Sequence, residues 1–273
     1  MTATPVVGHE IGEFIRQVIP PWLIPVFVLI TRIGNPAFFL ALFVLDYWFA
    51  DHERGSHAIG LAIAGMALVT ALKTFFDAPR PSEMTAVIPI SGYSFPSGHA
   101  TGSTIGYGIL AYDLEVGSRR SRYAVAAVLV ALIALSRVVL GVHFVRDVVA
   151  GMIIGVLFLA AAFALTEHDP REAFVLALAF GALAFVVSGA SHDGVAVLGA
   201  AVGGALTWEA LDSVPTLDSL RSKLLLLVGI LPVLLGIGYA GTELDVPLAF
   251  AFVANAAVMA GALAAPVAAE RFG

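Results

Sequence analysis

The sequence has no cysteine and little charge. The absence of cysteine among its 273 residues excludes disulfides, thiolate metal ligands and cysteine nucleophiles. Charged residues make up only 12% of the chain and hydrophobic residues 59%, whereas a soluble protein is about 25% charged and about 45–50% apolar. The formal net charge of −6 and the lack of a long basic tail argue against a nucleic-acid partner.

The hydrophobic residues form long blocks, and a helix needs roughly 20 such residues to cross a bilayer. The blocks lack the in–out alternation of a barrel strand. We therefore expect an all-α fold: a polytopic transmembrane helical bundle of about nine spans, surrounded by membrane lipids in the plasma membrane. The predicted spans are 36–50, 58–75, 99–116, 123–140, 144–165, 173–190, 195–211, 224–240 and 246–268.

The first 35 residues follow a different pattern. Residues 8–19 form a short amphipathic stretch, which favours a position at the membrane interface. Pro20 and Pro21 break it, and residues 21–33 are apolar but short and include Arg32. We expect residues 1–35 to be an N-terminal interfacial or re-entrant segment.

Two pairs of glycines lie four residues apart inside apolar blocks. They are Gly151 with Gly155 and Gly199 with Gly203. Small residues at this spacing let two membrane helices approach closely. We expect both pairs to serve packing within the protein rather than dimerisation.

Three polar clusters lie between residues 73 and 147, at the ends of apolar blocks. Their members that bear on chemistry are Lys73, Arg80, Ser97, Gly98, His99, Arg137, His143 and Asp147. Charge at a membrane helix end is costly unless the groups converge on a partner. Because three of these residues are cations, the cluster pattern predicts a phosphate as that partner.

The order of the spans places the three clusters on one side of the membrane. Lys73 ends one predicted span, His99 begins the next, and Arg137 and His143 follow after the chain has crossed back. The densest basic loop, residues 118–122, falls on the opposite side. Since basic loops stay in the cytoplasm, we expect the clusters to face the extracytoplasmic side.

Each cluster alone also fits a plain structural role. His143 and Asp147, four residues apart, share a helix face; the carboxylate either orients the imidazole or forms an ordinary ion pair. Ser97 suits an N-cap, and a helix N-terminus attracts anions but also simply begins a helix. The cations Lys73 and Arg80 could extend to the lipid headgroups. From the residues alone, an anion site of a transporter fits as well as an enzyme.

Together the clusters resemble a known family. The pattern Lys73-x6-Arg80-Pro81, Pro96-Ser97-Gly98-His99 and Ser136-Arg137-x5-His143-x3-Asp147 is similar to that of the phosphatidic acid phosphatase type 2 superfamily. That superfamily shares its site with vanadium haloperoxidases and class A acid phosphatases. The resemblance implies a catalytic phosphatase transmembrane core of five to six helices at 36–166. Residues 167–273 would be a C-terminal transmembrane helical extension.

The resemblance also implies a role for each residue. His143 would attack phosphorus to form a phosphohistidine, Asp147 would orient it, and His99 would act as general acid and base. The phosphate oxygens would be held by Lys73, Arg80, Ser97, Gly98 and Arg137. Neither a metal nor another cofactor is expected. The implied function is hydrolysis of a lipid phosphate or polyprenyl diphosphate monoester; the alternatives are a lipid phosphotransferase using the same site and a transporter or lipid-handling protein.

Overall fold

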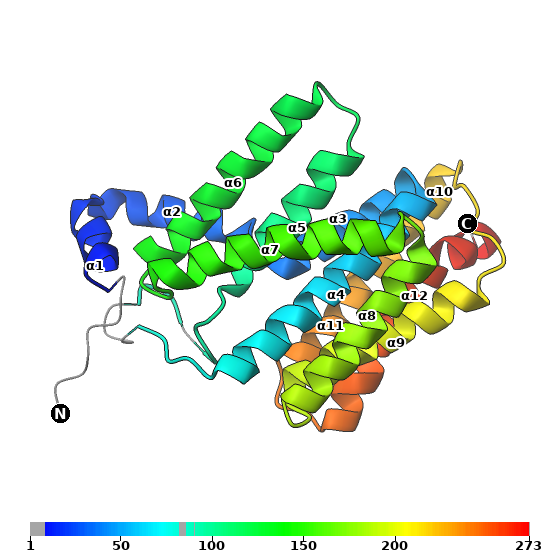
Figure 1. Ribbon diagram of the computed structural model, residues 1–273. Coiled ribbons are helices and arrows are strands. Elements are labelled where there is room, and N and C mark those ends of the chain that lie inside the picture. The colour runs from blue at the N-terminus through cyan, green and yellow to red at the C-terminus, as the bar shows by residue number, and fades with distance from the viewer. Residues whose placement is uncertain (1–8, 82–85, 90, 273) are drawn as a thin grey trace. The chain divides into compact units, whose positions relative to one another are not determined.

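The computed structural model describes residues 9–81, 86–89 and 91–272. All regular elements in these ranges are helices, with no β-strand among them, so the predicted all-α class is confirmed (Figure 1). The helices are α1 (His9–Val18), α2 (Ile24–Arg32), α3 (Pro36–Phe49), α4 (His52–Phe76), α5 (Gly98–Asp113), α6 (Arg119–Val139), α7 (Val145–Thr166), α8 (Pro170–Val187), α9 (His192–Ala210), α10 (Leu220–Leu224), α11 (Leu231–Thr242) and α12 (Leu248–Phe272). A π-helical stretch, Leu225–Ile230, joins α10 to α11.

The chain divides into two compact units. One comprises Met1–Phe39 and Leu72–Ala161, and the other comprises Leu40–Ala71 and Ala162–Gly273. Helices α3, α4 and α7 therefore contribute residues to both units. All three polar clusters belong to the first unit, so the candidate site is built within a single unit.

The count of nine spans is not confirmed. Each predicted apolar block coincides with a helix, but six helices in the described ranges are long and apolar enough to cross a membrane. Helices α3 and α5 have 14 and 16 residues, which at 1.5 Å per residue gives about 21 and about 24 Å, short of a hydrocarbon core of roughly 30 Å. Helix α9, with 19 residues, is the third predicted span that is not among the six. The segments Gly12–Val18 and Pro21–Arg32 make a seventh candidate if the pair, bent by 99°, counts as one.

The N-terminal helices pack on the end of α6. Phe27 of α2 forms a buried cluster with Val139, Leu140 and Val142, and partly buried residues of α1 and α2 surround it. A Cβ atom on Gly34 would overlap the side chain of Ile133, so the chain after α2 also lies against α6. This packing ties the N-terminal segment to the helix end that carries the third polar cluster.

Helix α7 lies close to α5 because Gly151 and Gly155 have no side chain. A Cβ atom on Gly151 would be 2.9 Å from the hydroxyl oxygen of Thr101, and one on Gly155 would be 2.6 Å from the Cβ atom of Thr104. The predicted packing role of this pair is confirmed. The close approach brings the first turns of α5 and α7, with the second and third polar clusters, side by side.

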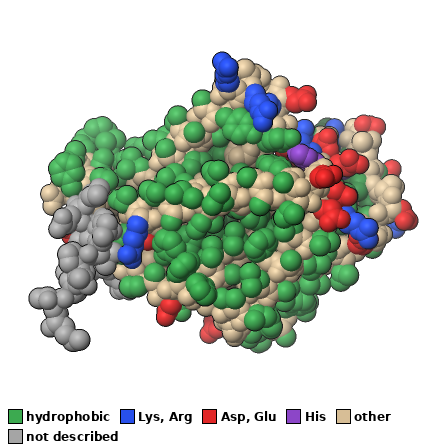
Figure 2. All heavy atoms as spheres, viewed as in Figure 1, with side chains coloured by type: hydrophobic (Ala, Val, Ile, Leu, Met, Phe, Trp, Pro, Cys, Tyr) green, Lys and Arg blue, Asp and Glu red, His purple; other side chains and the backbone are tan. Residues whose placement is uncertain are grey.

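The outward faces of α6 and α7 are apolar. Figure 2 shows hydrophobic side chains along both helices, with a group of basic side chains where α6 begins. The exposed residues of α6 include Val125, Val128 and Leu132, and those of α7 include Ile153 and Leu157. Such faces suit contact with lipid rather than with water.

The second unit contains an equally close pair of helices. Gly199 and Gly203 of α9 lie against the backbone of α12, where Cβ atoms would overlap the carbonyl groups of Phe252 and Ala256. The predicted packing role of this second pair is thus also confirmed. Backbone atoms cannot move aside as a side-chain tip can, so only glycine fits at these positions.

We expect Gly203→Ala to destabilise the folded protein by about 1–3 kcal/mol, because the added methyl group would force α9 away from α12. The matched control is Gly236→Ala in α11, where an added Cβ atom would meet nothing within 4 Å and alanine favours the helix. Thermal unfolding in detergent micelles should show a lower midpoint for Gly203→Ala only. Equal midpoints for the two variants would contradict the close contact.

Candidate active site

The turn between α6 and α7 places His143. Helix α6 ends in a Schellman motif, in which the N–H of Gly141 donates to Val138 O at 3.0 Å and that of Val142 to Arg137 O at 3.1 Å. Gly141 has φ +73°, a left-handed conformation that favours glycine. The N–H of His143 also donates to Arg137 O at 3.3 Å. The backbone of Arg137 therefore holds the chain that carries His143.

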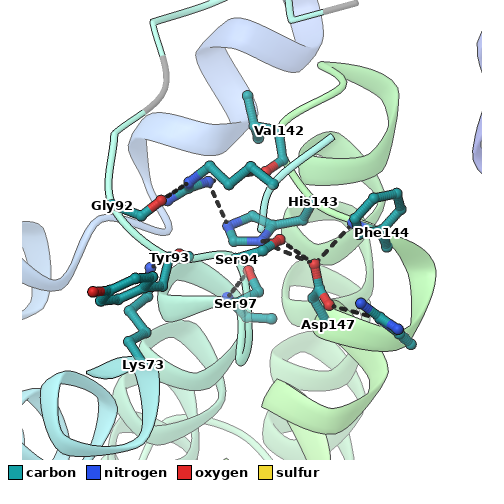
Figure 3. A network of polar contacts seen from close by, with 12 residues as sticks. Lys73, Gly92, Tyr93, Ser94, Ser97, Val142, His143, Phe144 and Asp147 are labelled. Carbon is teal, nitrogen blue, oxygen red and sulfur yellow. Dashed lines mark hydrogen bonds and ion pairs between the residues drawn. The ribbon is translucent and has the colours of Figure 1, made fainter. Parts of the chain in front are cut away.

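Asp147 holds one side of the His143 imidazole. The distance from His143 Nδ1 to Asp147 Oδ2 is 3.5 Å, and both side chains are buried. Figure 3 shows the carboxylate of Asp147 pointing toward the imidazole. The same Oδ2 accepts hydrogen bonds from the Ser94 hydroxyl and, at 3.0 Å, from the N–H of Phe144. Asp147 is the third residue of α7, so it reaches back to the helix start as in a capping box. The carboxylate is thereby fixed toward His143.

Arg80 lies on the other side of the imidazole. Its Nη1 is 3.3 Å from His143 Nε2 and donates to Val142 O at 2.9 Å, while its Nε donates to Gly92 O at 3.0 Å. A guanidinium group only donates hydrogen bonds, so His143 Nε2 must be the acceptor. The proton of the neutral ring then sits on Nδ1, facing Asp147. This tautomer leaves a lone pair on Nε2.

His143 is uncharged at neutral pH. Burial lowers its pKa to about 4; Arg80, Arg137 and Lys73 lower the pKa further, and the contact with Asp147 opposes them. Burial also lowers the pKa of Arg80, but an arginine side chain stays protonated in proteins. The site therefore pairs a neutral imidazole with cations, as an imidazole nucleophile acting on an anion requires.

The second cluster begins α5 beside Asp147. Ser97 is the N-cap of α5, where its hydroxyl accepts a hydrogen bond from Ala100 N at 3.4 Å. Its own backbone N–H donates to Asp147 O at 3.1 Å, which joins α5 to the first turn of α7. Gly98 and His99 lie in the first turn of α5. The first N–H groups of a helix have no partner within the helix and attract anions.

Two of the predicted cations, Lys73 and Arg137, are connected to the hydrogen bonds around His143 through other residues. Lys73, in the last turn of α4, donates to Tyr93 O at 2.9 Å, next to Ser94 (Figure 3). Arg137 donates from Nη1 to the hydroxyl of Thr31 at 2.7 Å. The structure thus brings His143, Asp147 and Arg80 into direct contact. The remaining predicted residues surround these three from the ends of α4, α5 and α6.

Sequence reasoning missed two residues of this region. Ser94 contacts Asp147, and its hydroxyl is 3.4 Å from His143 Nδ1. It lies three residues before Ser97, in the segment Gly92-Tyr93-Ser94. This closeness to the second cluster was the sequence feature that could have pointed to Ser94. Thr31 gives no signal at all, since it contacts a residue 106 positions away.

The comparisons with known proteins match the part of the chain that carries the three polar clusters. The PAP2 superfamily model matches residues 55–171, which include all eight predicted site residues. Phosphatidylglycerophosphatase B of Bacillus subtilis is 34% identical over 52% of this chain and 73% of its own length. Sphingosine-1-phosphate phosphatase 1 of mouse is 29% identical over 59% of this chain and only 38% of its own length.

Two solved structures share the fold. The crystal structure of a transmembrane PAP2-type phosphatidylglycerolphosphate phosphatase from Bacillus subtilis is 29% identical, with a TM-score of 0.51, and covers 58% of this chain and 83% of its own. LpxE of Aquifex aeolicus, at 24% identity and a TM-score of 0.51, covers 58% and 96%. With its long apolar helices and with all three motifs inside the matched segment, the chain is a multi-pass membrane protein that belongs to the PAP2 superfamily.

Proposed function

We propose that this protein is an integral membrane phosphatase that hydrolyses the phosphate monoester of a lipid through a phosphohistidine. The observation that carries the proposal is the environment of His143. Asp147 and Ser94 hold its Nδ1 side, and the guanidinium of Arg80 lies at Nε2. An oriented neutral imidazole next to a fixed cation is suited to attack on phosphorus.

The first half-reaction transfers the phosphoryl group to His143. As the phosphate enters, Arg80 Nη1 gives up its hydrogen bond to His143 Nε2 and donates instead to a non-bridging phosphate oxygen. The lone pair on His143 Nε2 is then free to react. Nε2 then bonds to phosphorus while the bond from phosphorus to the lipid oxygen breaks. His99, which becomes protonated when the phosphate anion binds beside it, gives its proton to the leaving alkoxide. Lys73, Arg137 and the N-terminal amides of α5 stabilise the negative charge on the phosphoryl oxygens.

The second half-reaction releases phosphate. His99, now neutral, takes a proton from a water molecule that attacks the phosphorus, and the bond to Nε2 breaks. Inorganic phosphate leaves, and both histidines return to their starting states. The hydrogen bond to Asp147 stabilises the positive ring of the intermediate, because Nδ1 keeps its proton throughout.

A lipid is the substrate that the setting favours. The site lies where α4, α5, α6 and α7 end or begin, so a phosphate there can stay joined to a tail in the bilayer. Phosphatidate, phosphatidylglycerol phosphate and polyprenyl diphosphates fit this description. We assign the catalytic role to residues 36–166 and regard 167–273 as an added helical part.

The test is phosphate release by the purified protein from a panel of these lipids in mixed micelles, with a chelator present. We expect release from at least one lipid phosphate, and faster release than from glycerol 3-phosphate, which has no tail. A protein that releases phosphate from no member of the panel would contradict the proposal. Anion flux without hydrolysis would favour the transporter alternative instead.

We further propose that the site faces the extracytoplasmic side. The basic residues Arg119, Arg120 and Arg122 lie in the first turn of α6, whereas Arg137 of the site lies in its last turn. Because the chain has no cysteine, single-cysteine variants give a clean test of orientation. Val87→Cys near the site should react with a membrane-impermeant maleimide in intact cells, and Ser118→Cys should react only after permeabilisation. The reverse pattern would place the site in the cytoplasm.

A further inference from the structure

Arg137 is buried with few partners. Its side chain is 7% exposed, and a guanidinium group has five N–H donors. Nη1 donates to Thr31, whereas Nε is buried and has no hydrogen-bond partner. Burying an incompletely paired cation is costly. The arrangement is therefore suited to a site in which an anion completes the hydrogen bonding of Arg137.

Thr31 is buried at the end of α2, between residues that pack on neighbouring helices. Its side chain is buried, at 6% exposed, on the side of α2 that packs against α6 through Phe27. Two residues later, the carbonyl of Ile33 accepts a hydrogen bond from the hydroxyl of Tyr107 at 3.2 Å. Gly34 then packs against Ile133. The hydroxyl of Thr31 thus has a fixed position from which to accept the bond from Arg137.

We propose that Thr31 is a positioning residue for the phosphate-binding guanidinium of Arg137. Through this hydrogen bond, the N-terminal segment, which lies outside the family match at 55–171, completes the phosphate site. The inference rests on the proposed function in one respect, namely that Arg137 binds the substrate phosphate. Because the hydrogen bond from Nη1 to Thr31 already restricts the guanidinium, less side-chain conformational entropy is lost when an anion binds its remaining donors. This lowers the free-energy cost of binding.

The variant that tests this is Thr31→Val, which keeps the shape of the side chain and removes the acceptor oxygen. Thr31→Ser keeps the oxygen and serves as the conservative rescue. Phe27→Leu is the matched packing control, since Phe27 packs on α6 from the same helix without a hydrogen bond to Arg137. Two readouts are measured for each: kcat/KM for a lipid phosphate, and the inhibition constant of inorganic phosphate.

We expect Thr31→Val to lower kcat/KM about tenfold and to weaken inhibition by inorganic phosphate by a similar factor, as for a lost hydrogen bond to a charged group. Thr31→Ser should stay near the wild type. In an Arg137→Ala background, Thr31→Val should have an effect of less than about twofold, because the two residues act through one contact. Phe27→Leu should lower the unfolding midpoint without changing the inhibition constant.

Three results would overturn the inference: unchanged constants in Thr31→Val, equal losses in Thr31→Val and Thr31→Ser, or a full additional loss in the Arg137→Ala background. If Thr31→Val does not accumulate as folded protein, the same comparisons are made with Thr31→Ala. A failure of the proposed function itself looks different. In that case the wild-type protein would release phosphate from no lipid of the panel, or His143→Ala and Arg137→Ala would keep the wild-type rate.

Discussion

His143→Ala is expected to reduce phosphate release from a lipid phosphate by about 10⁴-fold or more, since it removes the atom that we propose bonds to phosphorus. The imidazole is buried and held on both sides by Asp147 and Arg80. Activity is measured as inorganic phosphate released by purified protein.

Two further measurements make the result specific. Rapid quenching of the wild type with a ³²P-labelled lipid phosphate should trap an acid-labile, base-stable phosphoprotein, and His143→Ala should trap none. The matched control is His192→Ala at the start of α9, a histidine of the second unit, which should keep near-normal rates. A His143→Ala variant with near-normal hydrolysis would contradict the assignment.

His99→Ala is expected to slow hydrolysis of a lipid phosphate roughly 10²–10⁴-fold, the range for loss of a general acid. The alkoxide of a lipid is a poor leaving group and needs a proton as the bond to phosphorus breaks. 4-Nitrophenolate leaves without one, so the loss of the first half-reaction should be much smaller with 4-nitrophenyl phosphate. Single-turnover rates of phosphoprotein formation with the two substrates provide the comparison.

The size of the difference between the two substrates decides the role of His99. An equal loss of phosphoprotein formation for both would show that His99 binds phosphate or supports the fold instead of donating a proton. Asp147→Asn provides a useful contrast, because it keeps a similar shape but weakens the hold on His143 Nδ1. That variant should slow phosphoprotein formation from both substrates alike, since orientation of the nucleophile matters for each.

Much of the helical pattern was predictable because it depends on local chemistry. Each predicted apolar block coincides with a helix, and Pro20 and Pro21 lie where the amphipathic helix α1 has ended, as predicted. Which helices span the membrane was less predictable, since the blocks of α3 and α5 were counted as spans but form helices of 14 and 16 residues. Helix length depends on where the flanking turns begin, and hydropathy alone does not define those turns.

The site was predictable where its residues belong to motifs, and not elsewhere. His143 and Asp147 are four residues apart, so their contact follows from helix geometry. Ser94 reaches Asp147 across 53 positions and Thr31 reaches Arg137 across 106. Contacts of that separation depend on how α2, α5, α6 and α7 pack together, which no local pattern encodes.

By itself, the sequence determined that this is a helical membrane protein with three polar motifs at the ends of its helices. Composition and local spacing are enough for that, because water, lipid and helix geometry act on each segment separately. Only the tertiary structure decided which atoms of those motifs meet: Arg80 at Nε2 of His143, Ser94 at Asp147, and Thr31 at Arg137. These contacts form only when helices that are distant in the chain pack at a fixed separation. Gly151 and Gly155 of α7, for example, allow the close packing of α7 on α5.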